Sequence, residues 1–207
     1  MWHLCLRRCH NANGFLLPKT LIGGAIAMAV TKKVWTDEEI LSLKCEGKVE
    51  IVDGELKIMT PAGLEQEDVG AALVAALRPY VRQRNLGRIY MSQAGFRMPN
   101  GDLRAPDVSF VRTEKLPGGR SPKKFGHFPP DLAVEILAED ETPDDYAEKV
   151  REYLDWGVTL VWVIDPNTRT VWVHRKGRHP TQLSEDDELD GEDVIPGFRM
   201  PVKTLFE

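Results

Sequence analysis

Cysteine, positive charge and long apolar runs are all scarce in this sequence. Its 207 residues include only three cysteines, an odd number that favours reduced thiols in the cytoplasm over a disulfide framework. The formal net charge of −5 removes the simple electrostatic argument for nucleic-acid binding, although a basic patch can lie on an acidic body. The length suits one ordinary domain with a sizeable core.

Several motifs that would define a function are also missing. There is no glycine-rich nucleotide loop, no nucleophilic serine or cysteine motif and no DNA-reading helix signature. His3, Cys5, Cys9 and His10 do not have the spacing of a structural zinc site. The acidic stretch 185–193 lacks the carboxylate that closes a calcium loop, so we expect a solvated loop there.

The first residues are expected to lie apart from the fold. The apolar stretch 21–30 follows Pro18 and Lys19 and falls short of the length that spans a bilayer. We therefore expect residues 1–27 to be a disordered extension or the product of an upstream start, with a single domain over 28–207 and no membrane contact.

The order of helix and strand signals predicts a mixed α/β or α+β protein. Capping boxes at 36–39 and 142–145 mark two helix starts, and apolar spacing over 65–84 predicts the longest helix. Asp53-Gly54 is a hairpin turn between two β-like runs. The apolar run 158–164 is typical of a strand covered on both faces. We expect a mixed sheet flanked by helices.

Three residues form the candidate catalytic set. Asp107 begins one apolar β-like run and Glu135 lies inside another, where a lone carboxylate would be costly to bury without a partner or a metal. Lys149 lies at the edge of the apolar stripe of the helix after Thr142, and can turn its amine towards a cleft. The alternatives are a turn at Asp107, an edge strand that leaves Glu135 in water, and a Lys149 side chain directed to solvent.

These residue types suit the hydrolysis of a phosphodiester bond. Magnesium prefers oxygen ligands and is commonly held by one or two carboxylates plus substrate phosphate. Asp107 and Glu135 would supply the carboxylates, and the backbone carbonyl of Ile136 a third oxygen. Lys149 could then orient or deprotonate the attacking water and offset developing negative charge. Manganese would serve as an alternative ion.

A loop rich in glycine, proline and lysine, 112–130, carries the candidate nucleic-acid contacts. Its cations could bind phosphates, or the loop could simply be solvated. These cations are Lys115, Arg120, Lys123 and Lys124.

Residues spread over 28–207 resemble those of one family in the same order. The chain is similar to the Uma-two endonucleases of the PD-(D/E)XK, restriction-endonuclease-like superfamily. The resemblance implies a nuclease core in which Asp107 is the motif aspartate and Glu135 the acidic residue that follows. The positions that carry it are Val52-Asp53-Gly54-Glu55, 104–111, Val134-Glu135-Ile136-Leu137, Lys149 with Tyr153, 157–166 and Pro196-Gly197-Phe198.

Two positions depart from the pattern that the resemblance implies. Leu137 stands where the superfamily carries its lysine, so Lys149 would have to supply the amine from the helix. Gln66 stands where relatives often carry histidine, which leaves Glu65 as an auxiliary candidate for an outer metal contact.

The leading hypothesis is a cytoplasmic, magnesium-dependent endonuclease that acts on DNA. The alternative is a non-catalytic binding or assembly module that keeps the nuclease fold, motivated by the acidic net charge and by Leu137. A third hypothesis is a metal-dependent phosphohydrolase for smaller substrates. A homodimer would suit the cutting of two strands, but no residue predicts an interface.

Overall fold

The computed structural model describes residues 33–44 and 47–207. The expected N-terminal extension, all three cysteines and the rejected zinc site therefore lie outside the described residues. Within the described part of the chain, no helix is both long and apolar enough to cross a membrane.

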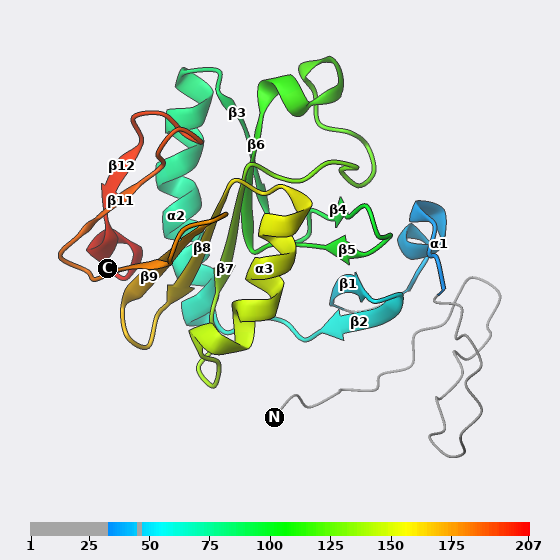
Figure 1. Ribbon diagram of the computed structural model, residues 1–207, viewed down its shortest axis with the longest axis horizontal. Coiled ribbons are helices and arrows are strands. Elements are labelled where there is room, and N and C mark those ends of the chain that lie inside the picture. Colours follow the sequence, from blue (N-terminus) through cyan, green and yellow to red (C-terminus); the bar gives the residue numbers. More distant parts are fainter. Residues whose placement is uncertain (1–32, 45–46) are drawn as a thin grey trace.

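Three sheets and three α-helices make up the described fold (Figure 1). The large sheet has the order β10-β9-β8-β7-β6-β3 and the small sheet the order β2-β1-β5-β4, while β11 and β12 form a separate pair. The strands are β1 (Lys48–Val52), β2 (Glu55–Met59), β3 (Gly87–Met91), β4 (Phe96–Arg97), β5 (Leu103–Arg104), β6 (Val108–Arg112), β7 (Leu132–Ile136), β8 (Leu160–Asp165), β9 (Thr170–Arg175), β10 (Thr181–Leu183), β11 (Glu188–Asp190) and β12 (Arg199–Pro201). The helices are α1 (Asp37–Leu41), α2 (Leu64–Gln83) and α3 (Ala147–Trp156), with short 3-10 turns η1 (Thr113–Lys115), η2 (Pro117–Gly119), η3 (Pro143–Tyr146) and η4 (Val202–Leu205).

The large sheet is mixed and is covered on both faces. β7 and β8 run parallel, whereas the other neighbouring pairs are antiparallel. Successive side chains of a strand point to opposite faces, so Val134 and Trp162 join the core beneath α2, while Ala133 and Val161 join the core beneath α3. This alternation explains why β7 and β8 are buried along their whole length.

The predicted helix boundaries agree closely with the structure. Thr36 caps α1 through a reciprocal capping box with Glu39, as predicted. The second predicted helix begins with the 3-10 turn η3, where the Asp145 carboxylate accepts the Thr142 N–H at 2.8 Å. Gly157 ends α3 with φ of 106°, a left-handed conformation that glycine adopts without steric penalty.

One alternative and one expectation need correction. Glu135 does not lie on a water-facing edge strand, because β7 is central and the residue is 1% exposed. The acidic stretch 185–193 is not only a loop, since Glu188–Asp190 pairs with β12 around the buried Leu189.

Candidate active site

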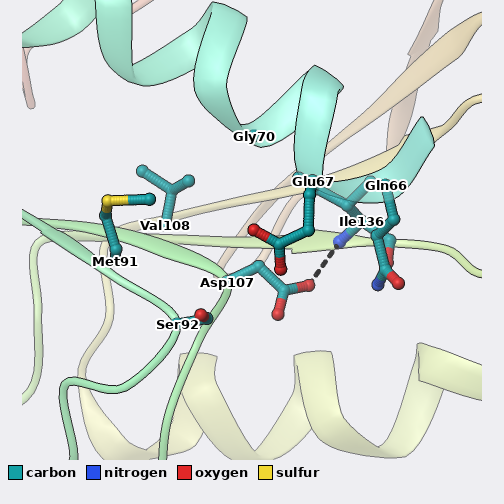
Figure 2. Close-up of a pocket in the computed structure, with 8 residues that line it drawn as sticks. All are labelled: Gln66, Glu67, Gly70, Met91, Ser92, Asp107, Val108 and Ile136. Carbon is teal, nitrogen blue, oxygen red and sulfur yellow. Dashed lines mark hydrogen bonds between the residues drawn. The ribbon is translucent and has the colours of Figure 1, made fainter. Parts of the chain in front are cut away.

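Strand pairing places Asp107 beside Glu135. Asp107 immediately precedes β6, and Val108, the first residue of β6, pairs with Val134 on β7. The Oδ2 atom of Asp107 accepts the backbone N–H of Ile136 at 2.9 Å (Figure 2). Asp107 therefore lies directly before β6, next to the strand that carries Glu135.

Glu135 points towards α3, and two side chains of that helix bind its carboxylate. Alternation along β7 directs Glu135 to the same face as Ala133, which packs beneath α3. The hydroxyl of Tyr153 donates to Oε1 at 2.7 Å, and the Lys149 ammonium donates to Oε2 at 2.9 Å. Both donors lie on α3, four residues apart and therefore on one side of the helix. Lys149 is thus part of the cluster and not a solvent-directed side chain.

Two residues of β1 also belong to the cluster, and sequence reasoning missed both. The Nζ atom of Lys48 lies 2.9 Å from Oδ1 of Asp107, and the Nζ atom of Lys149 lies 3.4 Å from Oε1 of Glu50. Glu50 is a buried carboxylate within a strand. The lone-carboxylate argument that singled out Glu135 could have found Glu50 as well.

Arg104 links the small sheet to α3. Its Nη1 atom lies 3.0 Å from Oε2 of Glu50, and its Nη2 atom contacts Glu152 on α3. The other oxygen of Glu50 accepts the Ala105 N–H at 3.0 Å. We call the whole set the charged cluster, in which carboxylates exceed cations by one. Its members are Lys48, Glu50, Arg104, Asp107, Glu135, Lys149 and Glu152.

Burial and the neighbouring charges together set the pKa values within the cluster. Burial raises the pKa of Glu135, and the nearby charges of Asp107 and Glu50 raise it further, while Lys149 opposes both. Burial alone would lower the pKa of Lys149, but the carboxylates of Glu135, Glu50 and Asp107 raise it above its ordinary value. Lys149 is therefore an ammonium ion at neutral pH.

Glu50 behaves differently because cations surround it. Burial would raise its pKa, but Lys149, Lys48 and Arg104 together lower the pKa of Glu50 to about 2. Glu50 is therefore ionised at neutral pH and acts as a fixed anion that holds the cations in place.

A small pocket opens beside Asp107 on the α2 side of the sheet. Its volume of about 20 Å³ is roughly that needed for one water molecule. Figure 2 shows the Glu67 carboxylate directed towards that of Asp107, and both residues line the pocket. Glu65, the predicted auxiliary residue, is exposed and does not line the pocket. Gln66 donates through Nε2 to the Ile136 carbonyl at 2.5 Å.

Comparison with known proteins supplies the family. A sequence profile named Uma2, described as "Putative restriction endonuclease", matches residues 37–203. The chain belongs to the Uma2 family. This membership confirms the resemblance stated from the sequence. No match was found among curated protein sequences.

One solved structure shares the fold of this chain. A crystal structure from Anabaena variabilis, described as "a putative nuclease belonging to DUF820", aligns with a TM-score of 0.71 and 18% sequence identity, covering 83% of this chain and 97% of that chain. This similarity confirms the mixed α/β fold class. A cryoEM structure described as "DrdV-DNA complex" aligns with a TM-score of only 0.32 and 16% identity, covering 69% and 91% of the two chains.

The donor atoms of this Uma2 chain suit a magnesium ion in their chemistry. Asp107, Glu135 and the Ile136 carbonyl offer oxygen ligands, and the charged cluster has a carboxylate in excess. Among residues 33–44 and 47–207, no three Asp, Glu, His or Cys side chains form a metal-binding group on their own. Magnesium does not require one, because it keeps several waters and uses one or two carboxylates.

Two of the four predicted nucleic-acid contacts of this Uma2 chain already form ion pairs with carboxylates of the protein. Lys115 lies 2.9 Å from the buried carboxylate of Asp131, and Lys124 pairs with Glu38. Arg120 and Lys123 are exposed. The η1 turn follows the last residue of β6, whereas Asp107 precedes the first, so Lys115 lies at the opposite end of that strand. The role of these cations stays a prediction.

Proposed function

We propose that this protein is a magnesium-dependent endonuclease that hydrolyses phosphodiester bonds in DNA. The observation that carries the proposal is the position of Asp107, directly before β6, beside the neighbouring strand β7 that carries Glu135, with the Lys149 ammonium 2.9 Å from Glu135. Membership of the Uma2 family supports the nuclease class. A cytoplasmic location and a homodimer stay predictions from the sequence.

Asp107 and Glu135 are the residues that we assign to the metal, with the Ile136 carbonyl as a third oxygen. Magnesium, or manganese, when bound there, would neutralise phosphate charge and lower the pKa of an attacking water. Gln66 would have to release the Ile136 carbonyl or share it, because a carbonyl oxygen has two lone pairs.

Lys149 acts as a cation in this proposal and not as the base. Its raised pKa keeps the ammonium protonated at neutral pH, so it can orient a water and stabilise negative charge as the phosphate reacts. Tyr153 holds the second oxygen of Glu135 and is fully buried. It is a positioning residue that fixes the direction of the carboxylate.

The test is cleavage of plasmid DNA by purified protein in magnesium, compared with Asp107→Asn and Glu135→Gln. These substitutions keep the shape of each side chain and remove its charge. We expect cleavage to fall at least about 100-fold in each variant. Glu148→Gln is the matched control, because Glu148 lies next to Lys149 on α3 but is exposed. Equal cleavage by Asp107→Asn and the parent protein would refute the assignment.

A binding or assembly module with the nuclease fold is the second candidate. It is favoured by one observation, that Asp107 and Glu135 already pair with Lys48 and Lys149. Titration calorimetry with magnesium separates the two candidates. A folded protein that binds no magnesium and cuts no DNA would support the module, whereas magnesium binding that Asp107→Asn abolishes would support the nuclease.

A further inference from the structure

Lys48 makes the contact that most directly affects the metal-binding capacity of Asp107. It begins β1 in the small sheet, yet its ammonium reaches Asp107 at the start of β6 in the large sheet. The Nζ–Oδ1 distance is 2.9 Å, and the two side chains are 13% and 18% exposed. The other oxygen of Asp107 accepts the Ile136 N–H. Both carboxylate oxygens are therefore engaged by the protein itself.

The three cations of the charged cluster are not held equally. Lys149 lies between Glu135 and Glu50, and Arg104 lies between Glu50 and Glu152. Among the described residues, Lys48 has a single ion pair, with Asp107, and its charge also helps to lower the pKa of Glu50. A lysine ammonium is also a strongly hydrated charge on a flexible stem. Lys48 is therefore the cation that breaks the fewest ion pairs when it leaves the cluster.

Charge balance indicates when Lys48 would leave. Carboxylates exceed cations by one in the cluster, so a divalent cation alone would produce an excess of positive charge. A divalent cation together with one phosphodiester group, which carries a single negative charge, would leave the cluster neutral. Partly buried charges are stable only when they are paired. The metal and the phosphate together therefore balance the net charge of the cluster better than either does alone.

We propose that Lys48 is a phosphate-binding residue whose ammonium becomes available when a divalent cation replaces it at Asp107. A divalent cation at Asp107 displaces the Lys48 ammonium, which then pairs with the phosphate of the nucleic acid. This inference rests on the proposed function, because it takes the metal and the phosphate from it. The binding of metal and the binding of nucleic acid then favour each other. The metal frees the Lys48 ammonium for the phosphate, and the negative charge of the phosphate offsets the positive charge of the metal.

Acetylation of lysines with an amine-reactive ester, followed by mass spectrometry, tests the movement of Lys48. We expect Lys48 to react at least about fivefold faster in saturating magnesium than in its absence, because the ion pair is lost. An excess of a DNA duplex should then slow the reaction again. Lys57 is the internal control, because it is exposed on β2 of the same hairpin. Its rate should not change with magnesium.

Calorimetry with magnesium alone provides a second measurement that does not depend on activity. Lys48→Gln should bind magnesium at least about fivefold more tightly than the parent protein, since no ammonium competes for Asp107. Lys48→Arg, which keeps the charge, and Lys57→Gln, which removes a charge from the same hairpin, should stay within about twofold of the parent. Circular dichroism confirms that each variant is folded.

The outcomes separate this inference from the proposed function. Magnesium binding and DNA cleavage with an unchanged Lys48 reaction rate, or with equal affinity in Lys48→Gln, would overturn the Lys48 inference alone. If neither the parent nor Lys48→Gln binds magnesium, both proposals fail. If magnesium exposes Lys48 but the duplex does not protect it again, the transfer to phosphate is wrong.

Discussion

The two faces of the large sheet are built on different principles, although the same strands supply both. Beneath α2 the sheet contributes apolar side chains, such as Val134, Ile136 and Trp162. Beneath α3 the apolar core is smaller, and it is joined by the charged cluster, of which Glu135 is a fully buried member. Buried ion pairs rarely add net stability over apolar residues. The α2 face thus holds most of the apolar core, whereas the α3 face holds the buried charges.

Trp162→Ala should cause the largest loss of stability, because it tests the apolar face. Trp162 is fully buried among the side chains beneath α2, and truncation of a buried tryptophan costs about 3–5 kcal/mol in the free energy of unfolding. Urea denaturation measures this loss. Trp162→Phe should cost less, because the indole N–H has no hydrogen-bond partner within the described residues. A loss below about 1 kcal/mol for Trp162→Ala would contradict the importance of this face.

Glu50→Gln should produce a loss of stability that depends on pH. The pKa of Glu50 is lowered from 4.5 to about 2, so its ionised form stabilises the fold above pH 4.5, and this contribution disappears as the pH falls towards 2. At pH 7 the variant should be less stable by roughly 2–4 kcal/mol. The difference from the parent protein should shrink below pH 4.5. A difference that is constant from pH 7 to pH 3.5 would show that charge is not the cause.

Glu135→Gln and Lys149→Gln should be coupled within the charged cluster. Each single variant removes one charge of the Lys149–Glu135 pair and leaves the other charge without that contact, whereas the double variant removes both charges. A double-mutant cycle on urea unfolding should therefore give a coupling free energy of about 1–3 kcal/mol. Two single-variant losses that simply add would show that the pair contributes no mutual stabilisation.

Gly157→Ala should have the smallest effect, and it separates the stability of α3 from that of its charges. Gly157 has φ of 106° at the end of the helix, where a side chain adds strain of about 1 kcal/mol. Thermal unfolding should reveal this small loss. Magnesium affinity should not change, because Gly157 lies beyond the last residue of α3. A large loss of affinity would show that the end of α3 positions Lys149.

Local patterns predicted most of the fold and the chemically unusual residues. Capping boxes, the Asp53-Gly54 turn and the apolar run of β8 mark elements through neighbours in the sequence, and the structure confirms them. Glu135 was identifiable because a carboxylate within an apolar strand needs a partner. The assignment of Asp107, Glu135 and Lys149 to catalysis stays a prediction, although the structure brings their side chains together.

The missed residues depend on contacts between distant segments. Lys48 and Asp107 are 59 positions apart and meet only when the small sheet packs against the large one. No local sequence pattern predicts that the two sheets pack together. Glu67, and not Glu65, lines the pocket beside Asp107, because neighbouring positions on a helix point in different directions. The role of Glu65 as an outer metal contact stays a prediction, although Glu65 does not line this pocket.

The central claim is that Asp107 and Glu135 hold a divalent cation. Anomalous diffraction from crystals grown with manganese tests it most directly, because the signal reports the position of the ion itself. We predict an anomalous peak in contact with the carboxylates of Asp107 and Glu135 and near the Ile136 carbonyl, and its disappearance in Asp107→Asn. A manganese peak elsewhere, with Lys48 still paired to Asp107 and Lys149 to Glu135, would contradict the account.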